Sequence, residues 1–238
     1  ARSGKAKNDW PAITKLLKRD KIDYEFAETE KKGHAIQLTQ EAIKSGYEKI
    51  IVVGGDGTLN EVVNGVFLQN MVDVSKITLA MLPVGTGNDW CRSFDVPIQY
   101  KQAIRLIRNY KTTLQDVGFL EFYEREFPQR YFANVAGLGF DALVAAGVNE
   151  LKEKGQGNAM IYMWVLLKSL LTYQSKNIDF KTVEDTFTGR FFSMAIGIGK
   201  YNGSGMKQLP NAITDDGLLD VTLIKKISKW VVVKELKN

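Results

Sequence analysis

Cysteine and histidine are almost absent from this sequence of 238 residues, which has one of each, Cys91 and His34. A single cysteine excludes an intrachain disulfide framework and fits a reducing compartment such as the cytoplasm. The pair also excludes a zinc site built from several cysteine or histidine ligands, and it leaves little for catalysis by a histidine triad. We expect Cys91 to be buried in packing, and any chemistry to depend on carboxylates, glycines and backbone amides.

Long hydrophobic runs are missing as well. The most apolar segment, Met160 to Leu171, has about 12 residues and contains Lys168, whereas a membrane-spanning helix needs about 20. No apolar core follows Arg2, so the sequence predicts no secretory signal. The 32 Lys and Arg exceed the 27 Asp and Glu by only five, and they are scattered along the chain. The composition therefore predicts a globular protein with no nucleic-acid partner.

The first half of the chain alternates predicted helices and strands. Two of the strands are short, apolar and β-branched, which is typical of strands buried on both faces of a parallel sheet. Each of these ends at a glycine-rich turn that opens a helix, and this pattern predicts an α/β open sheet with helices on both faces. The first predicted helix begins at Asn8 or Asp9 and ends at Leu17, and the others span 34–44, 59–67 and 100–109. The predicted strands are 22–26, 49–53 and 77–82.

The second half has mainly strand patterns, separated by turns, which predicts antiparallel sheet. One helix interrupts it, over about 158–173. We expect an α/β domain over residues 1–111 and an all-β, sandwich-like domain over 112–238. The predicted strands are 113–122, 129–135, 178–183, 191–198 and 218–224.

Two glycine-rich loops carry the functional signal: 54–58 (Gly-Gly-Asp-Gly-Thr) and 85–89 (Gly-Thr-Gly-Asn-Asp). Glycine lets backbone amides approach a phosphate, and a following helix presents its positive end to the same place. Both loops follow parallel strands, so they would share one ligand-binding edge. Asp56 would repel a phosphate unless a cation lies between them, which suggests that it acts through Mg²⁺. The alternative is an ordinary turn in which Asp56 caps a helix.

Residues 52–65 and 82–94 resemble the two signature loops of the diacylglycerol kinase catalytic domain family, which includes bacterial lipid kinases, sphingosine kinases and ceramide kinases. The resemblance implies an α/β nucleotide-binding domain followed by an antiparallel β-sandwich, with ATP and a lipid meeting in the cleft. It continues in order along the chain at 2–5, Thr29 with 33–35, 116–118, 134–141, 203–206, 210–212 and 215–220.

The resemblance also implies roles for single residues. Asp56 and Asp116 would be catalytic, in a Mg²⁺–water network near the phosphates. Asp216, with the backbone carbonyls of Ile213 and Leu218, would hold a second Mg²⁺, although a plain Asp-Asp-Gly turn is the alternative there. The ATP-binding residues would be Ser3, Gly4, Lys5, Thr29, Gly54, Gly55, Asp56, Gly57, Thr58, Leu59, Asn60, Glu61, Gly85, Thr86, Asn88 and Asp89.

Two features that the resemblance implies do not occur in the printed sequence. One is a strand before Arg2, and the other is a late Asp-Gly-Glu segment whose glutamate would be the general base. We therefore expect the sequence to be part of a longer kinase. Lys5, Lys152 and Lys154 are further candidates to pair with phosphate oxygens, each with a solvated surface lysine as the alternative.

The predicted function is ATP- and Mg²⁺-dependent transfer of the γ-phosphoryl group to a lipid hydroxyl, with diacylglycerol giving phosphatidic acid. The protein would be cytoplasmic, with transient peripheral contact at the inner face of the membrane, and a homodimer is possible. The alternatives are an NAD kinase-like enzyme, whose family shares a Gly-Gly-Asp-Gly-Thr loop, and a nucleotide-binding remnant without activity. The stripe of Met160, Met163, Trp164 and Leu167 is interpreted as core, with a lipid-contacting lip as the alternative.

Overall fold

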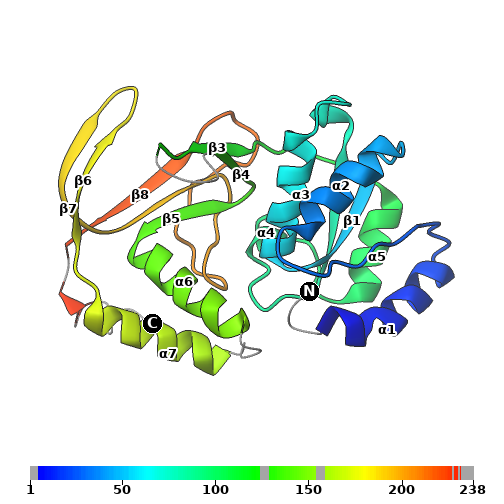
Figure 1. The fold of residues 1–238 in the computed structure, drawn as a ribbon, viewed down its shortest axis with the longest axis horizontal. Coiled ribbons are helices and arrows are strands. Elements are labelled where there is room, and N and C mark those ends of the chain that lie inside the picture. Colours follow the sequence, from blue (N-terminus) through cyan, green and yellow to red (C-terminus); the bar gives the residue numbers. More distant parts are fainter. Residues whose placement is uncertain (1–4, 124–128, 154–158, 227, 230, 232–238) are drawn as a thin grey trace.

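The computed structural model describes residues 5–123, 129–153, 159–226, 228–229 and 231, and Figure 1 shows them as two units. The first contains α1 to α5 around a parallel pair of strands. The second contains β3 to β8 with α6 and α7. The prediction of an α/β part followed by an antiparallel part is confirmed.

A pair of strands forms the centre of the α/β unit. β1 (Lys49–Gly54) and β2 (Thr78–Pro83) run parallel, with Ile51 opposite Ala80. Their apolar side chains face two layers of helices. One layer is α2 (His34–Lys44) and α3 (Asp56–Leu68), and the other is α1 (Lys5–Arg19) and α5 (Tyr100–Asn109). The one-turn helices η1 (Val74–Lys76) and α4 (Asp89–Ser93) lie before β2 and after its loop.

The predicted strand over 22–26 is wrong, because this segment pairs with no strand in the described part of the chain. Its alternating side chains pack on α1 instead. Ile22 and Tyr24 join the cluster beneath that helix, and the rings of Tyr24 and Phe26 lie 6.0 and 5.2 Å from the ring of Trp10. The alternation of apolar side chains here arises because one side of an extended segment is buried, and not because the segment pairs with another strand.

The start of the first helix was also predicted too late. α1 already includes Lys5, and neither Asn8 nor Asp9 is its cap. The carboxylate of Asp9 instead accepts a hydrogen bond from the hydroxyl of Tyr100 on α5, with 2.6 Å between the oxygens. Asp9, which lies two positions before Pro11, therefore links α1 to α5 rather than capping α1.

The second unit is organised by one long strand. β7 (Thr186–Gly197) pairs antiparallel with β5 (Val135–Gly139), β6 (Lys176–Lys181) and β8 (Asp220–Lys225). β3 (Gly118–Glu121) and β4 (Gln129–Phe132) form a separate hairpin. α6 (Phe140–Glu153) and α7 (Ala159–Thr172) pack together and cover the sheet with a cluster that includes Phe140, Val165 and Phe192.

Several predicted elements of this half need correction. The strand over 129–135 is two strands in different sheets, because the carbonyl of Asn134 turns to accept from the amides of Ile198 and Gly199. α6 was not predicted, although the buried residues Phe140, Val144 and Val148 recur at helical spacing. The remaining predicted strands have different bounds in the structure. The predicted strand 113–122 begins only at 118. The predicted strands 178–183, 191–198 and 218–224 are observed at 176–181, 186–197 and 220–225, respectively.

The core interpretation of the α7 stripe is wrong as well. Met163, Trp164 and Leu167 are 44%, 57% and 42% exposed, and Val165 and Leu166 are buried instead. The side chain of Met160 lies outside the described residues. Within the described residues, no helix has the length and apolar character that a membrane crossing requires.

Candidate nucleotide-binding site

The two glycine loops lie at one edge of the parallel pair and touch each other. The amides of Val84 and Gly85 donate to the carbonyl of Gly54, at 2.8 and 3.3 Å. A β-carbon on Gly85 would lie 2.8 Å from the Cα of Gly55, which is closer than real side chains approach. Glycine is therefore needed where the loops cross, and the predicted common edge is observed.

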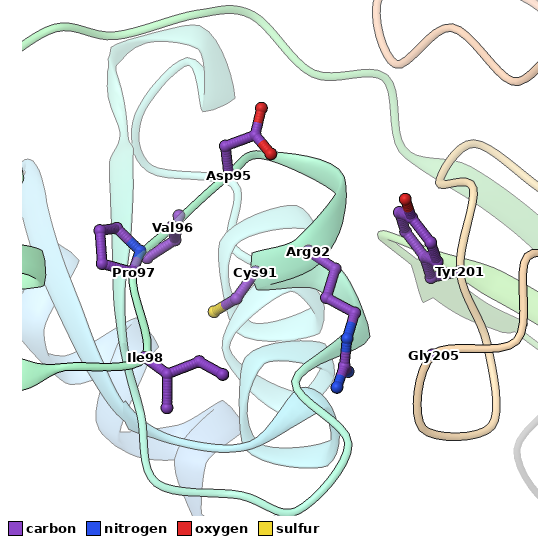
Figure 2. Close-up of a pocket in the computed structure, with 8 residues that line it drawn as sticks. All are labelled: Cys91, Arg92, Asp95, Val96, Pro97, Ile98, Tyr201 and Gly205. Carbon is purple, nitrogen blue, oxygen red and sulfur yellow. The ribbon is translucent and has the colours of Figure 1, made fainter.

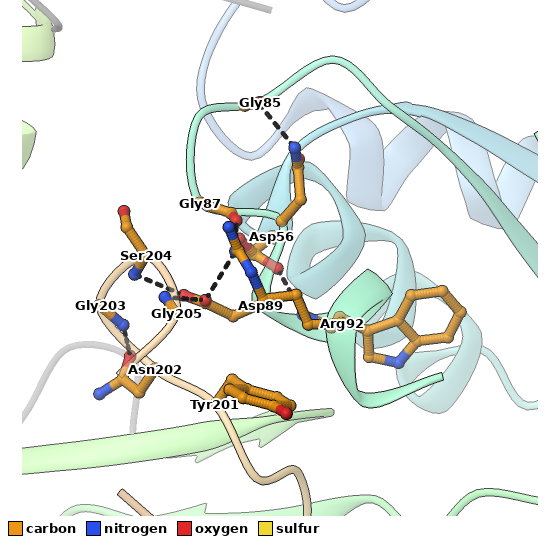
Figure 3. A network of polar contacts seen from close by, with 12 residues as sticks. Asp56, Gly85, Gly87, Asp89, Arg92, Tyr201, Asn202, Gly203, Ser204 and Gly205 are labelled. Atoms are coloured by element: carbon orange, nitrogen blue, oxygen red, sulfur yellow. Dashed lines mark hydrogen bonds and ion pairs between the residues drawn. The ribbon is translucent and has the colours of Figure 1, made fainter. Parts of the chain in front are cut away.

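Asp56 is the first residue of α3 and points between the loops (Figure 3). Its Oδ1 accepts from the backbone amide of Trp90 at 2.9 Å. Its Oδ2 faces Gly87, because a β-carbon on that glycine would lie 3.1 Å away. One oxygen of the carboxylate therefore orients the group, and the other is directed to the loop where a cation or a phosphate would lie.

Asp89 joins the second glycine loop to the other unit. Its Oδ2 accepts from the amide of Ser204 at 2.9 Å, and its Oδ1 accepts from the amide of Gly205 at 2.7 Å (Figure 3). Burial raises the pKa of this carboxyl, the charge of Asp56 adds to the rise, and the two amide bonds oppose it. Arg92 lies 3.3 Å from Asp89 and donates to the carbonyl of Gly87. We call this set of contacts the Asp89 clasp.

Asn88 braces the second loop from within. It has a left-handed backbone with φ of 52°, and its Nδ2 donates to the carbonyl of Gly85 at 2.7 Å. Its Oδ1 is buried and has no protein partner in the described structure. An unpaired buried acceptor in this loop fits a site that a ligand completes.

Side chains further along α3 fix the neighbouring elements. Asn64 is almost completely buried and pairs with both backbone groups of Tyr131: its Nδ2 donates to the carbonyl at 2.8 Å and its Oδ1 accepts from the amide at 3.0 Å. Asn60 donates to the same carbonyl and accepts from Arg130. Glu61 accepts from the amide of Ala35 at 3.3 Å. The predicted ATP ligands Asn60 and Glu61 therefore hold β4 and α2 in place.

The remaining predicted ATP-binding residues differ in how deeply they are buried. Leu59 is 3% exposed in the core, so only its backbone can face a ligand. Thr58 lies beneath Gly54, whose β-carbon would be 2.8 Å from the threonine Oγ1. Gly57 and Thr86 are exposed, and Thr29 lies half-buried in the extended segment before α2. Lys5 begins α1; Ser3, Gly4, Lys154 and the side chain of Lys152 lie outside the described residues.

Asp116 lies at the turn that carries the predicted second metal ligands. Its Oδ2 accepts from the amide of Gly217 at 2.6 Å, and its own amide donates to the carbonyl of Thr214. Asp216 accepts from the amide of Leu218 at 3.0 Å. Both carboxylates thus bond to the same turn, and carboxylate oxygens are ligands that a hard cation prefers. Within the described residues, no cluster holds three or more His, Cys, Asp or Glu.

Gln115 joins the two units beside the glycine loops, a position that the sequence did not reveal. Its Oε1 accepts from the indole of Trp90 at 2.8 Å, and its Nε2 donates to the carbonyl of Ala133. Since the amide of Trp90 also holds Asp56, the two predicted catalytic aspartates are connected through Trp90 and Gln115. No local motif marks this glutamine, because its partners come from both units.

An open cavity of about 490 Å³ lies beside the Asp89 clasp (Figure 2). Arg92 and Tyr201 approach it from the two units, and Val96, Pro97 and Ile98 form an apolar wall. Cys91 is 1% exposed, and burial raises the pKa of its thiol to about 12, with the charge of Asp56 contributing. The predicted burial of Cys91 is confirmed.

Comparisons with known proteins match both units. Residues 1–120 match the family model "diacylglycerol kinase catalytic domain", and residues 134–238 match "YegS C-terminal NAD kinase beta sandwich-like domain". A protein of Xanthomonas oryzae pv. oryzae named "probable lipid kinase YegS-like" is 30% identical over 90% of this chain and 67% of its own length. One of the same name from Pseudomonas aeruginosa is 31% identical over 81% of this chain and 59% of its own.

The fold is also found among solved structures. A crystal structure described as a diacylglycerol kinase from Bacillus anthracis str. Sterne aligns with a TM-score of 0.70 at 24% identity, over 98% of this chain and 72% of that one. The chain thus spans about three fifths to three quarters of the length of these proteins.

Proposed function

The chain belongs to the diacylglycerol kinase catalytic domain family of lipid kinases, and from this premise we propose that its glycine loops bind ATP for phosphoryl transfer to a lipid hydroxyl. The observation that carries the proposal is the contact between the two loops around Asp56. Together they offer backbone amides and a carboxylate at one point, at the start of a helix of 13 residues. Phosphoryl transfer needs little more from a protein than such positioning and charge stabilisation.

The phosphates would lie on the first turn of α3. The amides of Thr58 and Leu59 donate to the carbonyl of Gly55, so those of Asp56 and Gly57 would face the anion at the positive end of the helix dipole. Gly57 leaves the approach open, since a β-carbon there would meet nothing within 4 Å. The role of the glycine loops is therefore to bring backbone donors within hydrogen-bonding distance of an anion.

We propose Mg²⁺ as the cation of the site. A divalent cation near the phosphates would supply positive charge against the charge that develops during transfer. Asp56 would hold it through Oδ2, the oxygen that faces Gly87, while Trp90 keeps the other oxygen in place. We propose a different role for Asp116 than the network near the phosphates: with Asp216 it would hold a second ion at the turn of Gly217, where the ion would stabilise the second unit.

The acceptor that we propose is diacylglycerol, which would give phosphatidic acid for phospholipid synthesis. The apolar wall of Val96, Pro97 and Ile98 beside the clasp supports an acceptor with apolar chains. NAD is the alternative acceptor to be tested, because the family model that matches the second unit is named for an NAD kinase-like β-sandwich.

We further propose transient contact with an anionic membrane through the outer face of α7. Met163, Trp164, Leu167 and Leu171 form this α7 face, and all four are exposed. Lys168 lies 5.0 Å from the centre of the Trp164 ring, and Lys229 donates to the carbonyl of Leu171. Exposed apolar residues beside lysines are typical of helices that lie in a membrane interface. A second copy of the chain is the other possible occupant.

The decisive experiment is transfer of labelled γ-phosphate from ATP to diacylglycerol, sphingosine, prenols and NAD. We expect labelled phosphatidic acid, and a loss of roughly 100-fold or more with Asp56→Asn, because the amide keeps the bond from Trp90 but loses the charge. Asp179→Asn is the matched control, since Asp179 is exposed on β6, away from the loops. Label in NAD alone would refute the lipid assignment, and full activity in Asp56→Asn would refute the role of Asp56.

A further inference from the structure

Ser204 occupies an unusual backbone conformation at the tip of a turn from the second unit. Its φ is 71°, in the left-handed region that costs a residue other than glycine about 1 kcal/mol or more. The turn is closed by two backbone bonds between Asn202 and Met206, at 2.9 and 3.0 Å. The side chain of Asn202 also accepts from the amide of Gly203 at 2.9 Å. The surrounding bonds therefore hold Ser204 in this conformation.

The side chain of Ser204 lies beside Gly87 of the second glycine loop (Figure 3). The position that a β-carbon would occupy on Gly87 serves to locate the oxygens near this loop. Asp56 Oδ2 lies 3.1 Å from it, Asp89 Oδ2 lies 3.4 Å from it, and Ser204 Oγ lies 3.6 Å from it. Oxygens from both units thus lie within 4 Å of one point beside Gly87, and Ser204 provides the uncharged one of these three.

The Asp89 clasp sets the position of this hydroxyl. The amide of Ser204 donates to Asp89 Oδ2, and the next amide, that of Gly205, donates to Asp89 Oδ1. Two bonds to one carboxylate fix both the place and the orientation of the turn. The side chain of Ser204 is exposed, so its hydroxyl is accessible to a ligand on the loop.

We propose that Ser204 binds the terminal phosphate of the nucleotide, donating a hydrogen bond from the second unit, and that Asp89 is its positioning residue. The inference rests on the proposed function, which places phosphates on the glycine loops. The two carboxylates repel a phosphate unless a cation lies between, whereas a hydroxyl donates to it directly. The clasp that fixes the turn would then also place the hydroxyl that holds the terminal phosphate.

The test compares ATP and AMP binding to wild type, Ser204→Ala and Ser204→Gly by titration calorimetry with Mg²⁺ and without lipid. Both variants lack the hydroxyl, but glycine favours the observed φ and alanine does not. We expect ATP affinity to fall roughly 10- to 100-fold in both, the usual effect of losing a hydrogen bond to a charged group. AMP affinity should be unchanged, because AMP lacks the terminal phosphates.

Three results would overturn the inference alone. The first is a loss of ATP affinity in Ser204→Ala but not in Ser204→Gly, which assigns the effect to backbone strain. The others are equal losses of affinity for ATP and AMP, and unchanged ATP affinity in both variants. If the wild type binds no ATP, the proposed function fails and the inference fails with it.

Discussion

Gly55 and Gly85 are separated by 30 positions in the sequence, yet their backbones are in van der Waals contact where the two loops cross. A β-carbon on Gly85 would lie 2.8 Å from the Cα of Gly55, and one on Gly55 would lie 3.2 Å from the Cα of Gly85. Because the obstacle on each side is backbone, neither loop can yield by rotating a side chain. This contact sets how closely Asp56 approaches the second loop.

We expect Gly85→Ala to reduce the free energy of unfolding by about 1–3 kcal/mol, the usual cost of overpacking, and to weaken ATP binding. Denaturant unfolding and calorimetry would measure the two effects. Gly57→Ala is the matched control for stability: it lies in α3, its added carbon meets open space, and alanine favours a helix. Equal stability of both variants would contradict the close contact.

Asn64→Asp should destabilise the protein more than most single substitutions. Asn64 Nδ2 donates to the carbonyls of Tyr131 and Asn60, and a carboxylate would place negative charge against both. We expect a loss of about 3 kcal/mol or more, the cost of a buried unpaired charge. Thermal unfolding would measure it, with exposed Asn70→Asp as the control that changes stability by less than about 0.5 kcal/mol.

The raised pKa of Asp89 predicts a pH dependence of stability. The folded protein holds this proton more tightly than the unfolded chain, whose aspartate has the ordinary pKa of 3.8. The contribution of Asp89 is therefore fully present below 3.8 and is lost as the pH rises through the raised pKa. We expect the free energy of unfolding of wild type, relative to Asp89→Asn, to decrease between pH 3.8 and neutrality. A difference that is independent of pH would contradict the shift.

Cys91 should be inert toward thiol reagents in the folded protein. With a pKa of about 12, its thiolate fraction at pH 8 is about 10⁻⁴, against about a quarter for an unperturbed cysteine. We expect labelling by a chromogenic disulfide to be at least ~1,000-fold slower than after unfolding in guanidinium. Ser45→Cys, which adds an exposed thiol after α2, controls for reagent activity. Rapid reaction of native Cys91 would show that the thiol is accessible.

The α7 face should determine membrane binding. Leu171 and Leu114 are 74% and 75% exposed, so Leu171→Ala and Leu114→Ala remove the same surface from different places. We expect only Leu171→Ala to weaken flotation with anionic vesicles, by roughly tenfold. Equal effects would reject the α7 face as the docking site. Sedimentation that depends on concentration and is abolished by Leu171→Ala would instead assign the face to a second copy.

The sequence predicted elements where one local pattern dominated. β1 and β2 follow apolar runs that end at glycines, and α2 and α5 were predicted with their observed bounds, 34–44 and 100–109. The segment 22–26 has the same alternation as a strand, but the pattern cannot tell packing on α1 from pairing with another strand. α6 was missed because glycines and a strand-like start obscured its helical spacing.

The sequence predicted which residues make up the candidate site but not the hydrogen bonds that join them to other elements. The loop residues follow from their glycines and from Asp56, whereas the partners of Asn64, Asp89 and Gln115 lie on other elements. Asp89 and Gly205 are 116 positions apart. No local spacing encodes such a pair, because it depends on how the two units meet.

That separation gives the Asp89 clasp a place in the synthesis of the protein. Ribosomes deliver the chain from its N-terminus, and domains fold as units as they emerge. The helices α1 to α5 and both glycine loops are synthesised about a hundred residues before Ser204 and Gly205 leave the ribosome. During that interval Asp89 lacks the amides of Ser204 and Gly205. The two glycine loops can therefore meet early, but the Asp89 clasp can form only late in translation.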